Sequence, residues 1–207
     1  MLRRRTLVFF LLTLLPIALV ASQPTAEGAR LSAFLDSLQV GDLWVAGTHV
    51  NWRSGQPDAG NASGRGKKSH CSAFVASACE RLGVYILRPP EHGQVLLANA
   101  QYDWLRGPGR EDGWWAVDSG GEAQELANQG KIVVAVYRSS DRKKAGHIAI
   151  VRPGTKSDEL LTEEGPDVIQ AGQENYLSTS LKNGFRHHRG AWEGRNIRFY
   201  AHSRKGQ

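Results

Sequence analysis

Apolar side chains recur at helical spacing in several parts of the chain. The clearest case is SHCSAFVASACERLG, where the apolar residues from Cys71 to Leu82 fall on one face of a helix. Ser69 is expected to cap the N-terminus of this helix, and Gly83 to end it. The residues before it, 51–69, are rich in Gly and polar side chains and predict a long loop. The same helical spacing predicts further helices over residues 31–39, 94–105 and 122–128.

β-branched residues dominate the later part of the chain and predict strands. KIVVAVYR (131–138) and HIAIVRP (147–153) are two such runs, separated by a polar turn, and two more follow at 167–172 and 196–202. Residues 43–50 also have the composition of an extended segment. Short turns join consecutive strands more easily into an antiparallel meander than into a parallel sheet. The predicted fold class is therefore α+β, with N-terminal helices packed as one layer on a C-terminal antiparallel sheet.

The N-terminus has the three parts of a secretory signal. Residues 1–22 contain consecutive arginines, an uncharged apolar run and then small residues. The apolar run is shorter than the roughly 20 residues that span a membrane, so we expect a cleaved signal and no stable membrane anchor. Residues 23–30 are small and polar and predict a linker, and residues 31–207 a single domain. We expect the mature protein to be secreted or periplasmic.

Composition and charge narrow the function classes. With 41% hydrophobic and 22% charged residues, the chain of 207 residues is typical of a globular protein. The formal net charge is +6, but three of the arginines lie in the predicted signal. The remaining positive charge is too weak to indicate a nucleic-acid partner, although it suits an anionic cell-wall polymer. We expect a monomer.

The two cysteines are expected to be free, although an exported protein permits disulfides. Cys71 and Cys79 are eight residues apart on one helix and hence roughly 12 Å apart, whereas disulfide Cα atoms lie within about 7 Å. Cys71 lies in the first turn, where unpaired N–H groups and the helix dipole favour an anion, so we expect a thiol pKa below its ordinary value. Cys79 lies among apolar neighbours and is expected to be buried.

A general base for Cys71 is sought among the seven histidines. His147 follows Gly146 and begins a hydrophobic strand, at the end of the sheet where a helix N-terminus can approach. His70 is adjacent to Cys71 in sequence, but successive helical side chains point about 100° apart, which makes it a poor partner. The pair Cys71 and His147 is typical of a cysteine-dependent hydrolase.

A third polar group is expected to orient the imidazole. Gln170 lies inside the apolar run after His147, and its amide oxygen is able to accept a hydrogen bond from the ring. Gln173 and Asn175, a few residues later, remain alternatives.

These residues, in this order, resemble the CHAP family of cysteine- and histidine-dependent amidohydrolases and peptidases. The resemblance covers residues 69–175 and rests on HCSAFVASACERLG, ELANQGKIVVAVYR, AGHIAIVRP and VIQAGQEN. It implies a papain-like fold, Cys71 as nucleophile and His147 as base. It also implies hydrolysis of amide bonds in peptidoglycan, either within the stem peptide, as an endopeptidase, or at the link between glycan and peptide, as an amidase. Many members carry Glu or Asn as the third group, whereas this chain has Gln170.

Three further residues are candidates for substrate binding. Trp52, in the Gly-rich loop, is the best candidate for the wall of a binding groove, and Ser69 and His70 directly precede Cys71. No cofactor is required, and the histidines and cysteines lack the spacing of a metal site. Two alternatives to a hydrolase remain: a catalytically silent wall-binding module, and a thiol acyltransferase on the same fold.

Overall fold

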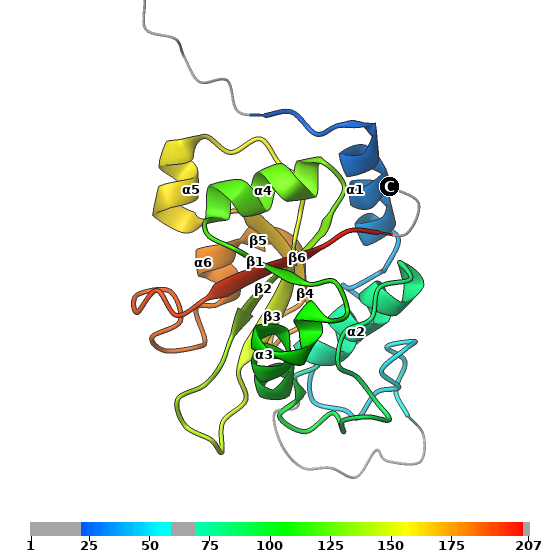
Figure 1. The fold of residues 1–207 in the computed structure, drawn as a ribbon. Helices are drawn as coiled ribbons and strands as arrows, with labels where there is room; N and C mark the ends of the chain where they lie inside the picture. Colours follow the sequence, from blue (N-terminus) through cyan, green and yellow to red (C-terminus); the bar gives the residue numbers. More distant parts are fainter. Residues whose placement is uncertain (1–21, 59–68, 205–207) are drawn as a thin grey trace, which may run out of the picture.

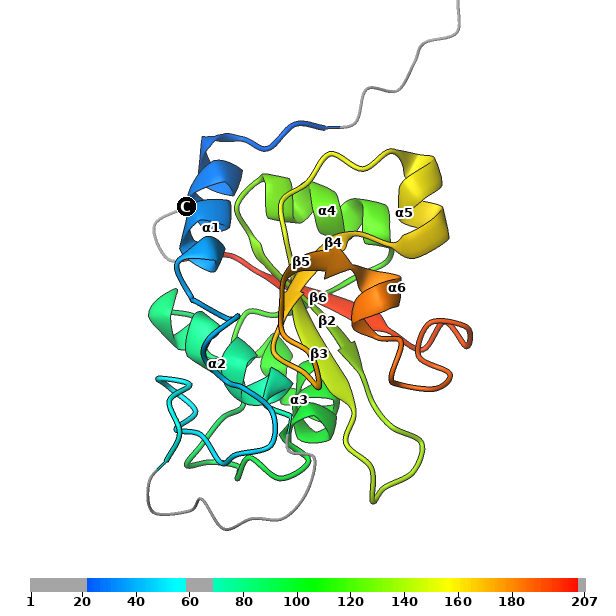
Figure 2. The same cartoon turned by 180° about the vertical axis from the view of Figure 1, so that it is seen from behind.

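The computed structural model describes residues 22–58 and 69–204, so the predicted signal lies almost entirely outside the described residues. Within the described part, the fold is α+β, with six strands in one antiparallel sheet in the order β1-β6-β2-β3-β4-β5. Figures 1 and 2 show the sheet in the middle of the molecule with helices on either side. None of the described helices is both long enough and apolar enough to cross a membrane.

The three central strands form the predicted meander. Tyr137 pairs with His147 where β2 turns into β3, and Ile150 pairs with Ile169 between β3 and β4. The edge strand β5 was not predicted, nor was the place of β6 between β1 and β2. The strands are β1 (Trp115–Val117), β2 (Ile132–Tyr137), β3 (His147–Val151), β4 (Asp167–Gln170), β5 (Tyr176–Ser180) and β6 (Arg198–His202).

Both faces of the sheet are covered by helices. Alternate residues of β2 belong to two separate hydrophobic clusters: Val134 packs with residues of α1, α2 and α3, and Val133 with residues of α4 and α6. The layer of helices that we predicted is therefore one of two, and burial on both sides explains why β2 is continuously apolar. The helices are α1 (Ala26–Asp36), α2 (Cys71–Arg81), α3 (Leu97–Arg106), α4 (Gly120–Asn128), α5 (Asp158–Glu164) and α6 (Leu181–Gly184).

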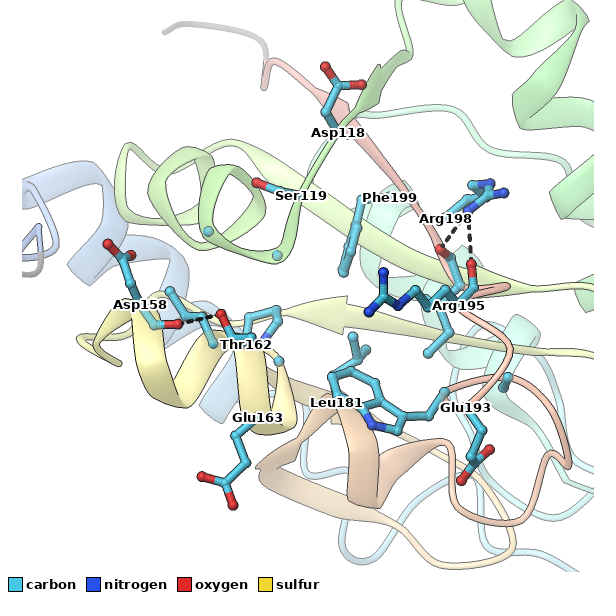
Figure 3. A pocket seen from close by; sticks show the side chains of 18 residues that line it. Asp118, Ser119, Asp158, Thr162, Glu163, Leu181, Glu193, Arg195, Arg198 and Phe199 are labelled. Carbon is cyan, nitrogen blue, oxygen red and sulfur yellow. Dashed lines mark hydrogen bonds between the residues drawn. The ribbon is translucent and has the colours of Figure 1, made fainter.

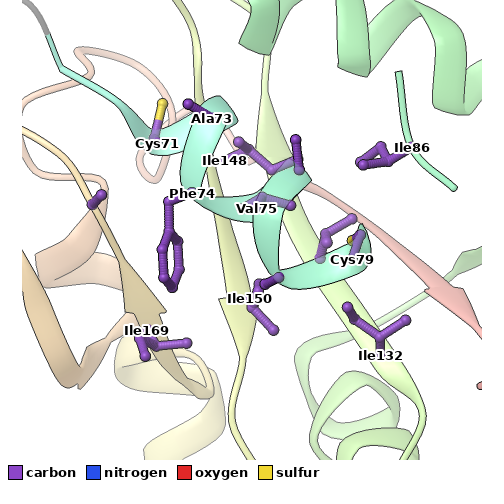
Figure 4. Packing of buried hydrophobic residues seen from close by; sticks show 14 of the residues in the cluster. Cys71, Ala73, Phe74, Val75, Cys79, Ile86, Ile132, Ile148, Ile150 and Ile169 are labelled. Atoms are coloured by element: carbon purple, nitrogen blue, oxygen red, sulfur yellow. The ribbon is translucent and has the colours of Figure 1, made fainter. Parts of the chain in front are cut away.

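Helix α2 carries the predicted nucleophile and packs directly on the sheet. Figure 4 shows Phe74 and Cys79 of α2 beside Ile148 and Ile150 of β3. The helix begins at Cys71, as predicted, and Gly83 ends it with a φ of +69°. The predicted cap is wrong: His70 occupies the N-cap position, and no side chain caps the helix.

Two other local predictions are corrected by the structure, and one helix was not predicted at all. Helix α1 begins at Ala26, inside the predicted linker, because the Thr25 side chain caps it by accepting from the Gly28 N–H. Residues 43–50 form turns rather than a strand, and Val50 alone pairs with Pro57 in an isolated bridge. Helix α5 lies in the polar stretch 155–166, for which no element was predicted.

Candidate active site

Cys71 lies at the first position of α2, against the beginning of β3. Its side chain is 4% exposed, and Cys79, eight residues on, is fully buried; neither forms a disulfide. The backbone N–H of Ile148, the residue after His147, points to the Cys71 sulfur together with the N–H groups of Ser72 and Cys71 itself. The packing of α2 on the sheet therefore brings the thiol next to the start of the strand that carries His147.

The electrostatics of Cys71 differ from the prediction. Burial raises the pKa of its thiol above the ordinary value, and this effect outweighs the N–H groups of Ile148, Ser72 and Cys71, which favour the thiolate. The helix N-terminus acts as predicted, but removal of the sulfur from water acts more strongly. The expected depression of the pKa is therefore wrong for this structure, in which burial of Cys71 favours the neutral thiol over the thiolate.

His147 and Gln170 form a buried hydrogen-bonded pair. The Nε2–H of His147 donates to Oε1 of Gln170 over 2.9 Å, with the two residues 2% and 3% exposed. The amide of Gln170 is held in this orientation because its Nε2 donates to the Glu174 carbonyl oxygen at 3.4 Å. An amide oxygen is only an acceptor, so the proton lies on Nε2 and the lone pair on Nδ1.

Two aromatic side chains from the segment after β5 hold the imidazole of His147. Phe185 meets it edge-on with ring centroids 4.7 Å apart, and His188 stacks on it at 4.7 Å with an interplanar angle of 16°. No sequence pattern indicated these contacts, because α6 and the turn after it are too short to show a hydrophobic period. The hydrogen bond to Gln170 alone would allow the imidazole ring to tilt. The contacts with Phe185 and His188 restrain the plane of the ring.

Two neighbouring cavities surround these residues. His147 and Gln170 line one of about 450 Å³, and Cys71 lines another of about 610 Å³. Ser69 and Ala145 belong to the lining of both, so the cavities meet there. No hydrogen bond joins Cys71 to His147 within the described chain.

The alternatives to Gln170 are placed differently. Gln173 is exposed in the lining of the His147 cavity. The side chain of Asn175 is engaged by backbone groups: its Nδ2 donates to the carbonyl oxygens of Val40 and Leu43, and its Oδ1 accepts from the Gly172 N–H. Of the three candidates, Gln170 is the one that hydrogen-bonds to His147.

The predicted substrate-binding residues lie beside Cys71. Trp52, Ser69 and His70 all line the Cys71 cavity. His70 also has a structural part, because its Nε2–H donates to the Thr48 carbonyl oxygen over 2.7 Å. Trp52 is half-buried, with the guanidinium of Arg53 4.7 Å from its ring centroid. In the described part of the chain, no group of three or more His, Cys, Asp or Glu side chains is placed to hold a metal ion.

We expect stability to fall between pH 6.5 and 5. Burial, with a smaller effect of neighbouring histidines, lowers the pKa of His147 to about 3 and that of His188 to about 4. Below the unfolded value of 6.5 the unfolded chain therefore binds protons that the folded protein does not. Each group costs about 1.4 kcal/mol per pH unit, so the free energy of unfolding should drop by up to about 4 kcal/mol over this interval.

Urea denaturation at the two pH values measures this loss. The pKa values of Glu80 and Glu174 are also lowered, by hydrogen bonds from Arg53 and Tyr176 respectively, but these carboxyls lose stabilisation mainly below their ordinary value of 4.5. The loss of unfolding free energy above pH 5 therefore reports the lowered pKa values of His147 and His188. His188→Gln should reduce the pH dependence by about half, and an unchanged dependence would show that His188 titrates normally in the folded protein.

Comparison with known proteins bears on the chemistry of this site. No family model matches the chain. Over 97 residues it is 35% identical to the peptidoglycan amidase Tse1 of Pseudomonas aeruginosa. The chain is similar to a peptidoglycan amidase. The match covers 47% of this chain and 53% of Tse1, so the chain spans about half the length of this relative.

Proposed function

We propose that this protein is a cysteine-dependent amidase of peptidoglycan with a papain-like catalytic domain that extends from α1 to β6. The observation that carries the proposal is the buried His147–Gln170 hydrogen bond beside a cysteine at a helix N-terminus. These residues are of the types that act as nucleophile, base and orienting group in amide hydrolysis by a thiol. Similarity to Tse1 supports the wall polymer as the substrate.

The reaction begins with a neutral Cys71 and a neutral His147, as burial of both groups favours. As the sulfur attacks the amide carbonyl carbon, the thiol proton passes to Nδ1 of His147, and the carbonyl π electrons move to oxygen. The tetrahedral intermediate then expels the amine, which takes its proton from His147. Water, deprotonated by the same nitrogen, attacks the thioester and releases the carboxylic acid and the thiol.

Gln170 acts on these reaction steps through His147. Its Oε1 holds the Nε2–H tautomer, which leaves Nδ1 as the nitrogen that exchanges protons with sulfur, amine and water. The backbone N–H of Cys71, at the N-terminus of α2, is a donor for the oxyanion. We expect the contact between the Cys71 sulfur and Nδ1 of His147 to shorten when substrate binds, because catalytic hydrogen bonds are often long in the free enzyme.

The site suits an acyltransferase equally well up to the thioester. The two functions differ in whether water or an amine accepts the acyl group, and similarity to the peptidoglycan amidase Tse1 supports water as the acceptor. Peptidoglycan lies outside the cytoplasm, so the proposal includes export, for which residues 1–22 provide the signal.

Product analysis tests the proposed reaction. Purified peptidoglycan should yield fragments that each carry one new amine or one new carboxyl group, detected by liquid chromatography and mass spectrometry. New reducing sugar ends without new amines would mean a glycosidase. Fragments joined to an added amine at the expense of free carboxylate would favour the acyltransferase.

A further inference from the structure

The proposed nucleophile and base belong to different elements of the fold. Cys71 begins α2, and His147 begins β3 after a largely exposed turn over residues 139–146. Tyr137 of β2 pairs with His147, but β4 pairs with β3 only from Ile150 onward. His147 therefore lies beyond the ladder that joins β3 to β4, and its position depends on how the turn before it is held.

Asn99, near the start of α3, holds both ends of this turn. Its Oδ1 accepts from the backbone N–H of Ser139 over 3.1 Å, and its Nδ2 donates to the carbonyl oxygen of Lys144 over 2.9 Å. The Asn99 side chain is 8% exposed, and hydrogen bonds shielded from water in this way are stronger than exposed ones. The asparagine therefore fixes the two ends of a turn whose own side chains lie mostly in solvent.

The backbone directly before His147 is packed against the same amide. A Cβ atom on Gly146 would lie 2.6 Å from Oδ1 of Asn99 and 2.1 Å from the carbonyl oxygen of Tyr137. Both distances are shorter than a side chain tolerates, so this close approach requires glycine. The Asn99 side chain thus lies next to the residue that precedes the proposed base.

Gln101 links the same helix to the first turn of α2. It is fully buried, and its Nε2 donates to the carbonyl oxygen of Ser72 at 3.3 Å and to that of Leu87 at 3.0 Å. Its Oε1 has no hydrogen-bond partner among the residues that the structure describes, which is unfavourable in a core. An amide is therefore a poor choice for filling this space, and the two donated hydrogen bonds favour a positional role for Gln101.

Helix α3 therefore touches the three parts of the proposed site. Asn99 holds the turn that leads to His147, and Gln101 holds the carbonyl group of the residue after Cys71. The two residues directly before Asn99 line the Cys71 cavity. A helix that is hydrogen-bonded to both elements fixes the distance between the side chains that these elements carry.

We propose that Asn99 and Gln101 are positioning residues, through which α3 sets the distance between the Cys71 sulfur and Nδ1 of His147. The inference rests on the proposed function, because it gives the two amides a part in that reaction. The proton of the thiol reaches Nδ1 only when the two atoms come within hydrogen-bond reach. A displacement of about 1 Å is enough to lower such a rate on the order of 10²-fold.

Alkylation of Cys71 by iodoacetamide at neutral pH tests this role without a substrate. The base accelerates the reaction by accepting the thiol proton, so His147→Gln should slow labelling of Cys71 at least about tenfold. Asn99→Ala should slow it by a similar factor, and the double variant should be no slower than His147→Gln, because Asn99 acts through the base. Gln101→Leu, which acts at the other end of the link and keeps the core filled, should slow labelling several-fold.

Asn128 offers a matched control on the other face of the sheet. It is a 1% exposed asparagine at the end of α4, and its amide both donates to and accepts from the backbone of Gly154. Helix α4 begins beside a separate cavity of about 750 Å³, shown in Figure 3, whose described lining includes none of the proposed catalytic residues. Asn128→Ala should therefore destabilise the fold as Asn99→Ala does, measured by urea denaturation, and leave the labelling rate of Cys71 unchanged.

The possible results separate the inference from the proposed function. If Asn99→Ala slows labelling no more than Asn128→Ala does, Asn99 is merely structural and the inference is overturned, while slow labelling of His147→Gln still supports the catalytic pair. If the effects of Asn99→Ala and His147→Gln multiply in the double variant, Asn99 does not act through His147, which also overturns the inference. If His147→Gln is labelled as fast as the unmodified protein, the proposed function fails and the inference fails with it.

Discussion

Replacing Cys71 by alanine should reduce amide hydrolysis of peptidoglycan to the background rate, a loss of at least about 10⁴-fold. No other thiol can substitute for it, because Cys79 is fully buried two turns further along α2 and burial raises its pKa. The rate of release of new amines from purified peptidoglycan measures this loss. The fold should survive, since the substitution removes one sulfur atom at the edge of the core.

Cys79→Ala is the matched control for this experiment. It removes the same atom from the same helix, in the middle of the hydrophobic cluster, and should lower the free energy of unfolding by about 1–2 kcal/mol. Its activity should remain close to that of the unmodified protein. If Cys71→Ala digested peptidoglycan at a rate similar to that of Cys79→Ala, the thiol mechanism would be wrong.

The second large effect is expected at His147. His147→Gln removes the nitrogen that exchanges the proton while keeping a polar side chain of similar length beside Phe185, and kcat should fall about 10³-fold or more. Steady-state kinetics on a soluble peptidoglycan fragment separates kcat from KM. A change confined to KM would assign His147 to substrate binding instead.

Gln170 should show a graded effect because it is a positioning residue. Gln170→Ala removes the acceptor for Nε2 and should lower kcat substantially, but less than His147→Gln does. Gln170→Glu keeps an acceptor and should retain more activity than Gln170→Ala. Its carboxylate favours the imidazolium and raises the pKa of His147, so the acidic limb of the kcat profile should move to higher pH. A structural role alone would leave that limb in place.

Much of the scaffold around the site could be predicted from local patterns. Helix α2 has a clear helical period, strands β2 and β3 are continuous apolar runs, and the polar turn between these two strands favours an antiparallel order. Cys71 at a helix start and His147 at a strand start followed directly from these boundaries. Gln170 was predicted as one of three candidates, and only the tertiary structure shows which of them meets the imidazole.

The remaining features of the site, which are the ring contacts of His147 and the pKa of Cys71, depend on contacts between distant parts of the chain. Helix α6 has four residues, too few to show a period, yet the segment it begins places Phe185 and His188 against His147. The pKa of Cys71 was predicted from the helix N-terminus alone, which is a local effect. Burial of Cys71 against β3 is a tertiary effect that changes the pKa in the opposite direction. The size of this effect cannot be read from a sequence pattern.

The most direct test of the account is to alkylate the protein with iodoacetamide and measure two quantities on each sample. Peptide mass spectrometry gives the fraction of Cys71 and of Cys79 that is labelled, and amine release from peptidoglycan gives the remaining activity. We predict that activity falls in proportion to the labelling of Cys71 while Cys79 stays unmodified. Full activity in a sample whose Cys71 is completely alkylated would contradict the assignment of this residue as the nucleophile.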